Sequence, residues 1–181
     1  MDAVHYADCA DFPMYLRAYF SYKNNLPFSF GMDLNANSPN SMQLETIAKR
    51  REQAIAKGQE REFESSLKDI RYSVNGNYYG TRINTPNTSG AQRDFFVVAS
   101  NIMNQISSGS YRMLFTPPGK TLADFYSPAV NKDSITVGTV LYKATGHVAI
   151  IYDITPEGEI RFMDAHPDGS VSRGFYSKEY G

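Results

Sequence analysis

Three residues of this sequence have the types that a thiol hydrolase needs. Cys9 is the only cysteine and lies at the start of an apolar stretch with helical spacing. His147 begins an apolar, β-rich segment, and Asp164 lies near the end of the next such segment. A thiol can serve as a nucleophile, an imidazole as its base, and a carboxylate can orient that base. We therefore predict that Cys9, His147 and Asp164 form a catalytic triad.

Each of these residues also has an ordinary structural interpretation. A cysteine in an aromatic helix is most often a small core residue, a histidine beside a glycine is usually a polar edge residue, and Asp164 could simply end a strand. Their joint occurrence on a helix and two neighbouring strands favours catalysis. A helix start and an imidazolium both lower a thiol pKa, so we expect Cys9 to hold thiolate at neutral pH. Fast alkylation with a midpoint well below pH ~8.5 would distinguish it from a core cysteine.

The composition is that of a globular chain with a core of its own. The 181 residues are 41% hydrophobic and 13% aromatic, which suits one domain. Eighteen basic and nineteen acidic side chains nearly cancel, so no basic footprint for nucleic acid is present. No apolar run approaches the ~20 residues of a membrane helix, so we expect no membrane span. A lone cysteine excludes an internal disulfide, and the histidines and acids lack tight ligand spacing, so we expect no metal or cofactor.

Apolar spacing and stop signals divide the first two thirds of the chain into segments. Asn24-Asn25 and the Ser107 to Ser110 run would each end a helix, and Asn75-Gly76 is a tight-turn signal. The predicted segments are a helix over about 9–23, a loop over 31–40, a charged helix or helix pair over 41–71, a hairpin and loop over 72–94, and a helix over 95–106.

The last third of the chain is β-rich. Residues 136–142, 147–154 and 159–164 are joined by two short connections, which indicates an antiparallel meander. One helix packed on such a sheet predicts an α+β fold, as a single domain over residues 1–181 with a largely helical insert at about 30–135. Long insertions emerge at the surface near such junctions, so we expect this one to cover a cleft partly and to narrow substrate choice.

The β-rich segments resemble the core strands of NlpC/P60 cysteine peptidases and their amidase relatives. The matching runs are Val137-Gly138-Thr139-Val140-Leu141-Tyr142, His147-Val148-Ala149-Ile150-Ile151-Tyr152 and Arg161-Phe162-Met163-Asp164-Ala165, and Asp8-Cys9 is similar to the Asp-Cys pair of that family. The resemblance implies a papain-like fold, with the nucleophile helix packed on an antiparallel sheet. It also implies that Cys9 is the nucleophile, His147 the base and Asp164 the third member.

A second resemblance is to the transglutaminase-like hydrolases. Their nucleophile segment is similar to Cys9-Ala10-Asp11 followed by a helix that ends at Asn25-Leu26-Pro27-Phe28. It implies the same triad, and it leaves acyl transfer to an amine open beside hydrolysis. A binding module on the same fold without turnover is the remaining alternative.

The favoured chemistry is attack of the Cys9 thiolate on an amide or ester carbonyl, with a thioester intermediate. The free backbone N–H of Cys9 would help to hold the oxyanion, with Tyr6 as a second donor. We expect Asp164, and not His166, to orient the base, because Pro167 indicates that the strand ends at His166. The expected substrate is a peptide or amide, cell-wall peptides included, at the cell envelope or outside the cell. Because Cys9 lies so near the start, we expect the chain to be a processed piece of a longer protein.

Overall fold

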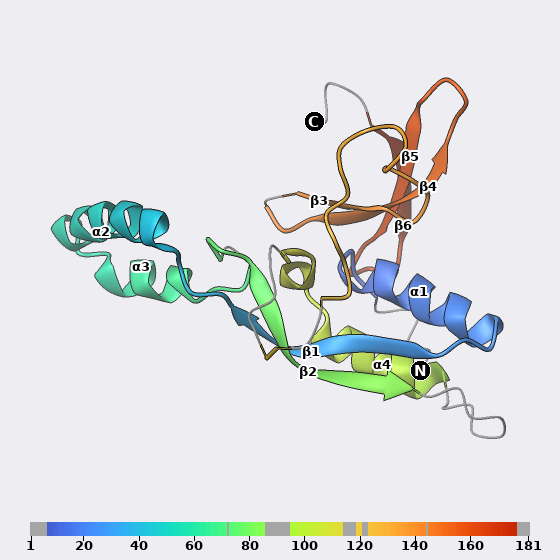
Figure 1. The fold of residues 1–181 in the computed structure, drawn as a ribbon, viewed down its shortest axis with the longest axis horizontal. Coiled ribbons are helices and arrows are strands. Elements are labelled where there is room, and N and C mark those ends of the chain that lie inside the picture. Colours follow the sequence, from blue (N-terminus) through green and yellow to red (C-terminus); the bar gives the residue numbers. More distant parts are fainter. Residues whose placement is uncertain are drawn as a thin grey trace. The chain divides into compact units, whose positions relative to one another are not determined.

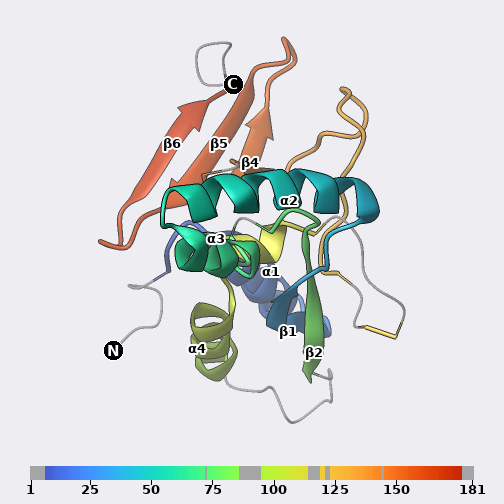
Figure 2. The ribbon, with the colours of Figure 1, turned by 90° about the vertical axis from the view of Figure 1, so that its left-hand side faces the viewer.

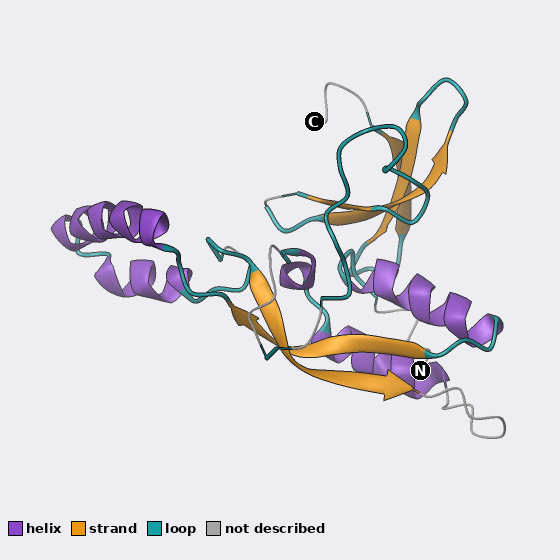
Figure 3. Ribbon diagram, viewed as in Figure 1, coloured by secondary structure: helices purple, strands orange, loops and turns teal. Residues whose placement is uncertain are grey.

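The computed structural model describes residues 7–71, 73–85, 95–113, 119–120, 123–143 and 145–176. In these residues the fold is α+β, with antiparallel sheets (Figure 1 and Figure 3). The chain divides into two compact units. Unit 1 takes residues up to Phe30, Ile83–Ser108 and the residues from Ser127 onward, and unit 2 takes Gly31–Arg82 and Gly109–Tyr126. The residues of the predicted 30–135 insert are thus divided between the two units.

The helices of unit 1 are α1, Asp11–Lys23, and α4, Phe95–Gln105. Both were predicted from the sequence, and both predictions are confirmed. Asn24 caps the C-terminal end of α1, and Asn25 then takes a left-handed conformation with φ 55°, which turns the chain out of the helix. The Phe95 ring of α4 lies against three tyrosines of α1, with ring centroids 5.3 to 5.6 Å away: Tyr15, Tyr19 and Tyr22. This aromatic contact packs the two helices together.

The main sheet of unit 1 is an antiparallel meander in the order β3-β4-β5-β6, as Figure 2 shows for the last three strands. Its strands are β3, Val140–Tyr142, β4, Val148–Ile154, β5, Ile160–Ala165, and β6, Val171–Phe175. The predicted meander is confirmed, although β3 is shorter than expected because Gly138 turns the chain at φ 90°. The sequence prediction missed β6, which follows the tight turn at Gly169 and is largely exposed, so it has little apolar alternation.

The two-stranded sheet of β1, Phe28–Ala36, and β2, Asn77–Thr85, corrects two predictions. Only residues 37–40 of the predicted 31–40 loop are a loop, because residues up to Ala36 continue β1. The Asn75-Gly76 turn forms, with Gly76 at φ 69°, but the strand that follows it pairs with β1 and makes no local hairpin. Residues 86–94, the remainder of the predicted loop, lie outside the described residues. Pairing with a distant strand has overridden the loop-like composition of both segments.

The charged stretch forms the predicted helix pair in unit 2: α2, Ser41–Ala56, and α3, Glu60–Leu67. Asn40 and Gln43 form a reciprocal capping box at the start of α2, with bonds of 3.0 and 2.8 Å. Gly58, at φ 69°, ends the helix and lets the chain turn into α3. A short 3-10 helix, Ser108–Tyr111, follows α4. In the described part of the chain, no helix combines the length and apolarity needed to cross a membrane.

Candidate active site

Two aspartates fix the turn that carries Cys9. The Asp8 carboxylate accepts the backbone N–H of Ala10 at 2.8 Å and that of Asp11 at 3.2 Å. In return, Asp11 Oδ2 accepts the backbone N–H of Asp8 at 3.3 Å. This reciprocal pattern resembles a capping box between Asp8 and Asp11, in the turn that leads into α1, whose own N-cap residue is Ala10. Cys9 lies in this turn, two residues before α1 begins, and these hydrogen bonds fix the turn without using the Cys9 side chain.

The thiol of Cys9 reaches the start of β4. The backbone N–H of Val148 is near enough to the Cys9 sulfur to favour the thiolate and so to lower the pKa of the thiol. Val148 is fully buried and directly follows His147 in the sequence, while Cys9 is partly exposed. The predicted nucleophile thus lies near the residue that follows the predicted base, but among the described residues no hydrogen bond joins the Cys9 sulfur to the His147 ring.

His147 is held by Asp164. The ring Nε2 of His147 lies 2.6 Å from Asp164 Oδ2, and the Asp164 residue is only 5% exposed. The Asp164 carboxylate accepts a hydrogen bond from Nε2, so a neutral His147 ring carries its hydrogen on Nε2 and has an unprotonated Nδ1. Nδ1 is then the nitrogen that can take a proton from a thiol. Nearly half of the His147 side chain is exposed, so a substrate can approach this ring.

His166 is a second imidazole near the same carboxylate. Its Nε2 lies 3.8 Å from Asp164 Oδ2 and makes its close contact, 2.7 Å, with Ser172 Oγ on β6. The His147 and His166 rings are nearly parallel, with centroids 6.4 Å apart. The short contact between Asp164 and a ring nitrogen is thus made to His147, while β6 anchors His166.

Comparison of this chain with protein-family models, with curated proteins and with solved structures gave no match. Its function has to be inferred from its own residues.

The electrostatics of Cys9 differ from the sequence-based expectation. Burial is the largest effect and raises the pKa of the Cys9 thiol; the Val148 N–H lowers it, and the charges of Asp8, Asp164 and Asp11 raise it further. The net direction is upward, so the thiolate expected at neutral pH is not favoured. The prediction overlooked the three carboxylates around the sulfur. This environment favours the neutral thiol.

We expect alkylation of Cys9 by iodoacetamide to have its midpoint above the ordinary thiol value of about pH 8.5. The reason is that burial and neighbouring carboxylates disfavour the thiolate. The measurement is the rate of modification of the native protein between pH 6 and 10, followed by mass spectrometry of the Cys9 peptide. A midpoint below pH 8 would contradict this electrostatic account.

Asp11 is the site residue that sequence reasoning missed. Burial and the charge of Asp8 raise its pKa to about 7, well above the ordinary range of a carboxyl group. The Asp8–Asp11 spacing is visible in the sequence as a capping-box pattern, which could have identified it. Its burial, by contrast, is a property of the fold.

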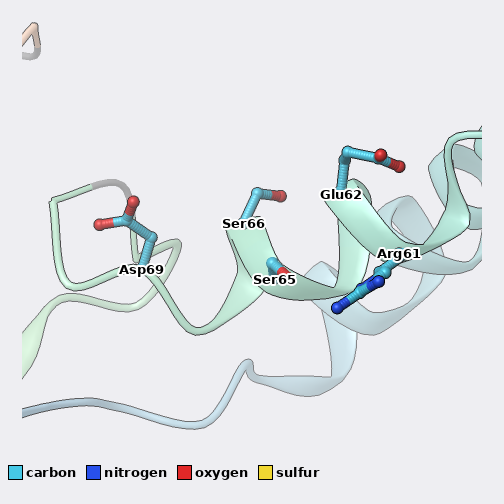
Figure 4. Close-up of a pocket in the computed structure, with 5 residues that line it drawn as sticks. All are labelled: Arg61, Glu62, Ser65, Ser66 and Asp69. Atoms are coloured by element: carbon cyan, nitrogen blue, oxygen red, sulfur yellow. The ribbon is translucent and has the colours of Figure 1, made fainter.

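Three further features bear on the site: the donors for an oxyanion, any cluster that could hold a metal, and a surface hollow. The backbone N–H of Cys9 makes no hydrogen bond within the described part of the chain, so it stays available to an oxyanion, whereas Tyr6 lies outside the described residues. Among the described residues no cluster of histidine, cysteine and acidic side chains could hold a metal. A shallow polar hollow on unit 2 runs along α3 (Figure 4) and contains none of the predicted triad; it is lined by Arg61, Glu62, Ser65, Ser66 and Asp69.

Proposed function

We propose that this protein is a cysteine hydrolase, a peptidase or amidase with a papain-like, NlpC/P60-like arrangement of helix and sheet. The main support is the 2.6 Å contact between His147 Nε2 and the buried Asp164, next to a strand start whose backbone N–H lowers the pKa of the Cys9 thiol. The nucleophile comes from the turn before α1, the base from the residue before β4, and the orienting group from the end of β5.

In the proposed reaction, His147 Nδ1 takes the thiol proton as the Cys9 sulfur attacks the carbonyl carbon of an amide or ester. The tetrahedral intermediate collapses when the carbon–nitrogen or carbon–oxygen bond breaks, and His147 returns the proton to the leaving group. The acyl group remains on Cys9 as a thioester. Water, deprotonated by His147, then releases the acid and restores the thiol. The free Cys9 N–H supports the oxyanion in both steps.

Intact-mass spectrometry with an activated ester tests the proposal. p-Nitrophenyl acetate should add one acetyl group to the wild-type protein, peptide mapping should place it on Cys9, and it should turn over with water. The Cys9→Ala variant should show no acetylation at this peptide. Acetylation at equal rates in wild type and a His147→Gln variant would mean that Cys9 reacts as an ordinary thiol, and would overturn the proposal.

The geometry predicts different effects for the two groups nearest to His147. Asp164→Ala should lower the rate of Cys9 acylation by about 10- to 100-fold, a part of what a positioned base contributes, because the ring loses its orienting partner. His166→Ala should change the rate by less than about threefold, because His166 makes its close contact with Ser172 instead. Burst kinetics with p-nitrophenyl acetate measure both rates. Retained activity in Asp164→Ala with lost activity in His166→Ala would reverse the assignment.

A further inference from the structure

We propose that Asp11 is a positioning residue of this site that works as a neutral acid, sharing a proton with the Asp8 carboxylate and so holding the turn that carries Cys9. This inference deepens the proposed function and rests on it for its catalytic meaning. It begins from the capping box and concerns a residue that does not itself touch a substrate.

The surroundings of Asp11 suit a carboxylic acid better than a carboxylate. The residue is only 5% exposed. Its Oδ1 is buried and has no hydrogen bond in the described part of the chain, and its Oδ2 accepts a single, long bond of 3.3 Å from the Asp8 N–H. Burying a charge with so few donors costs more free energy than burying a carboxyl group that keeps its proton.

The neighbour of Asp11 supplies a partner for that proton. Asp8 is another carboxyl group in the same box, and its Oδ1 already accepts two backbone N–H groups. Burial, the charge of Asp8 and the interaction with the Asp8 side chain favour the protonated form of Asp11, the Asp8 backbone N–H favours the carboxylate, and together they raise its pKa to about 7. A protonated Asp11 can donate to the Asp8 carboxylate and still accept the Asp8 N–H, so both halves of the box are satisfied.

Loss of this proton would act on the nucleophile. The charged groups that raise the pKa of Cys9 are Asp8 and Asp11 in its own turn and Asp164 on β5, while the Val148 N–H on β4 lowers it. A second negative charge on the box repels both the Asp8 carboxylate and a thiolate at Cys9. Neutral Asp11 therefore preserves the bonds between residues 8 and 11 and makes it easier for Cys9 to form a thiolate. Both effects weaken as the pH rises through about 7, because Asp11 then loses its proton.

Asparagine separates this role from simple packing. An amide at position 11 is nearly the same shape as the protonated acid: its NH₂ can donate to Asp8 and its oxygen can accept the Asp8 N–H, yet it does not titrate. Asp11→Ala removes both bonds. Asp133 lies in an exposed turn of unit 1 and has no role in the proposed site. Asp133→Asn makes the same chemical change there and is the matched control.

The test is the pH dependence of Cys9 alkylation by iodoacetamide in the wild type and these three variants. Asp11→Asn should lower the alkylation midpoint by about 0.3 to 1 pH unit, as expected for the loss of one nearby charge in a partly exposed site. Below pH 7, the alkylation rates of Asp11→Ala should differ from those of Asp11→Asn, because alanine makes neither bond to Asp8. The alkylation profile of Asp133→Asn should match that of the wild type. An unchanged midpoint in Asp11→Asn, or identical profiles for the Asn and Ala variants, would overturn the proposal.

A direct titration complements the alkylation experiment. The ¹³C carboxyl resonance of Asp11 should titrate with a midpoint near 7 in the wild type and closer to its ordinary range in Asp8→Asn, where the neighbouring charge is gone. A wild-type midpoint below 5 would refute the neutral-acid role. Neither measurement needs turnover. If the protein hydrolyses no ester or amide while these shifts occur, the hydrolase proposal fails and the inference about Asp11 and Cys9 stands.

Discussion

Turnover of p-nitrophenyl acetate is expected to fall by about 10²- to 10⁴-fold when His147 is replaced by glutamine, the range that a positioned general base contributes. The effect should be large because the Cys9 thiol has a raised pKa and so depends on a base to lose its proton. The fold should survive, since nearly half of the His147 side chain is exposed. Stopped-flow release of p-nitrophenol gives the rate, and circular dichroism checks the fold.

The Cys9→Ala variant sets the background for this comparison, because it has no thiol to acylate. Full alkaline recovery of His147→Gln activity would still fit the proposal, since hydroxide can replace the base once the thiol ionises by itself. A His147→Gln variant with wild-type activity at pH 7 would remove His147 from the reaction.

The free energy of unfolding is expected to rise by on the order of 2 to 4 kcal/mol at pH 8.5 when Asp11 is replaced by asparagine, and to change little at pH 4. The folded-state pKa of Asp11 is raised from 3.8 to about 7. Between these values the folded chain holds a proton that the unfolded chain has released, so wild-type stability falls as the pH rises and levels off above about 7. Asparagine does not titrate, so the variant escapes this loss.

Urea unfolding followed by tyrosine fluorescence at several pH values measures the difference; the chain has 13 tyrosines and no tryptophan. The exposed Asp133→Asn control should show no difference that grows with pH. An equal change in stability at pH 4 and pH 8.5 would mean that Asp11 acts through packing alone and not through its charge.

The segments that could be predicted from the sequence carry their own start and stop signals. The helices over 9–23 and 95–106 and the helix pair over 41–71 combine apolar spacing with clear ends, such as Asn24-Asn25 and Gly58. The first three strands of the meander have short connections, so their pairing is local. Such segments can be predicted because the residues that define their ends and their pairing are close in sequence.

The segments that were mispredicted depend on distant partners. Gly31–Ala36 has a polar, loop-like composition and becomes part of a strand only because β2, some forty residues later, pairs with it. Gly31 shows the constraint, because a Cβ atom there would lie 2.1 Å from the ring of Tyr79 on β2. The exposed edge strand β6 was missed for a related reason, since its partner β5 defines it more than its own residues do.

The sequence by itself determined which groups can do chemistry and how Cys9 is presented. The Asp8-Cys9-Ala10-Asp11 spacing is enough for reciprocal bonds that place the thiol in the turn before α1, because these bonds are local. Only the tertiary structure decided that His147 contacts Asp164 and that the Val148 N–H acts on the pKa of the Cys9 thiol. It also decided the charge states, because desolvation and Coulomb interactions depend on burial and distance in space, and these raise the pKa of both Cys9 and Asp11.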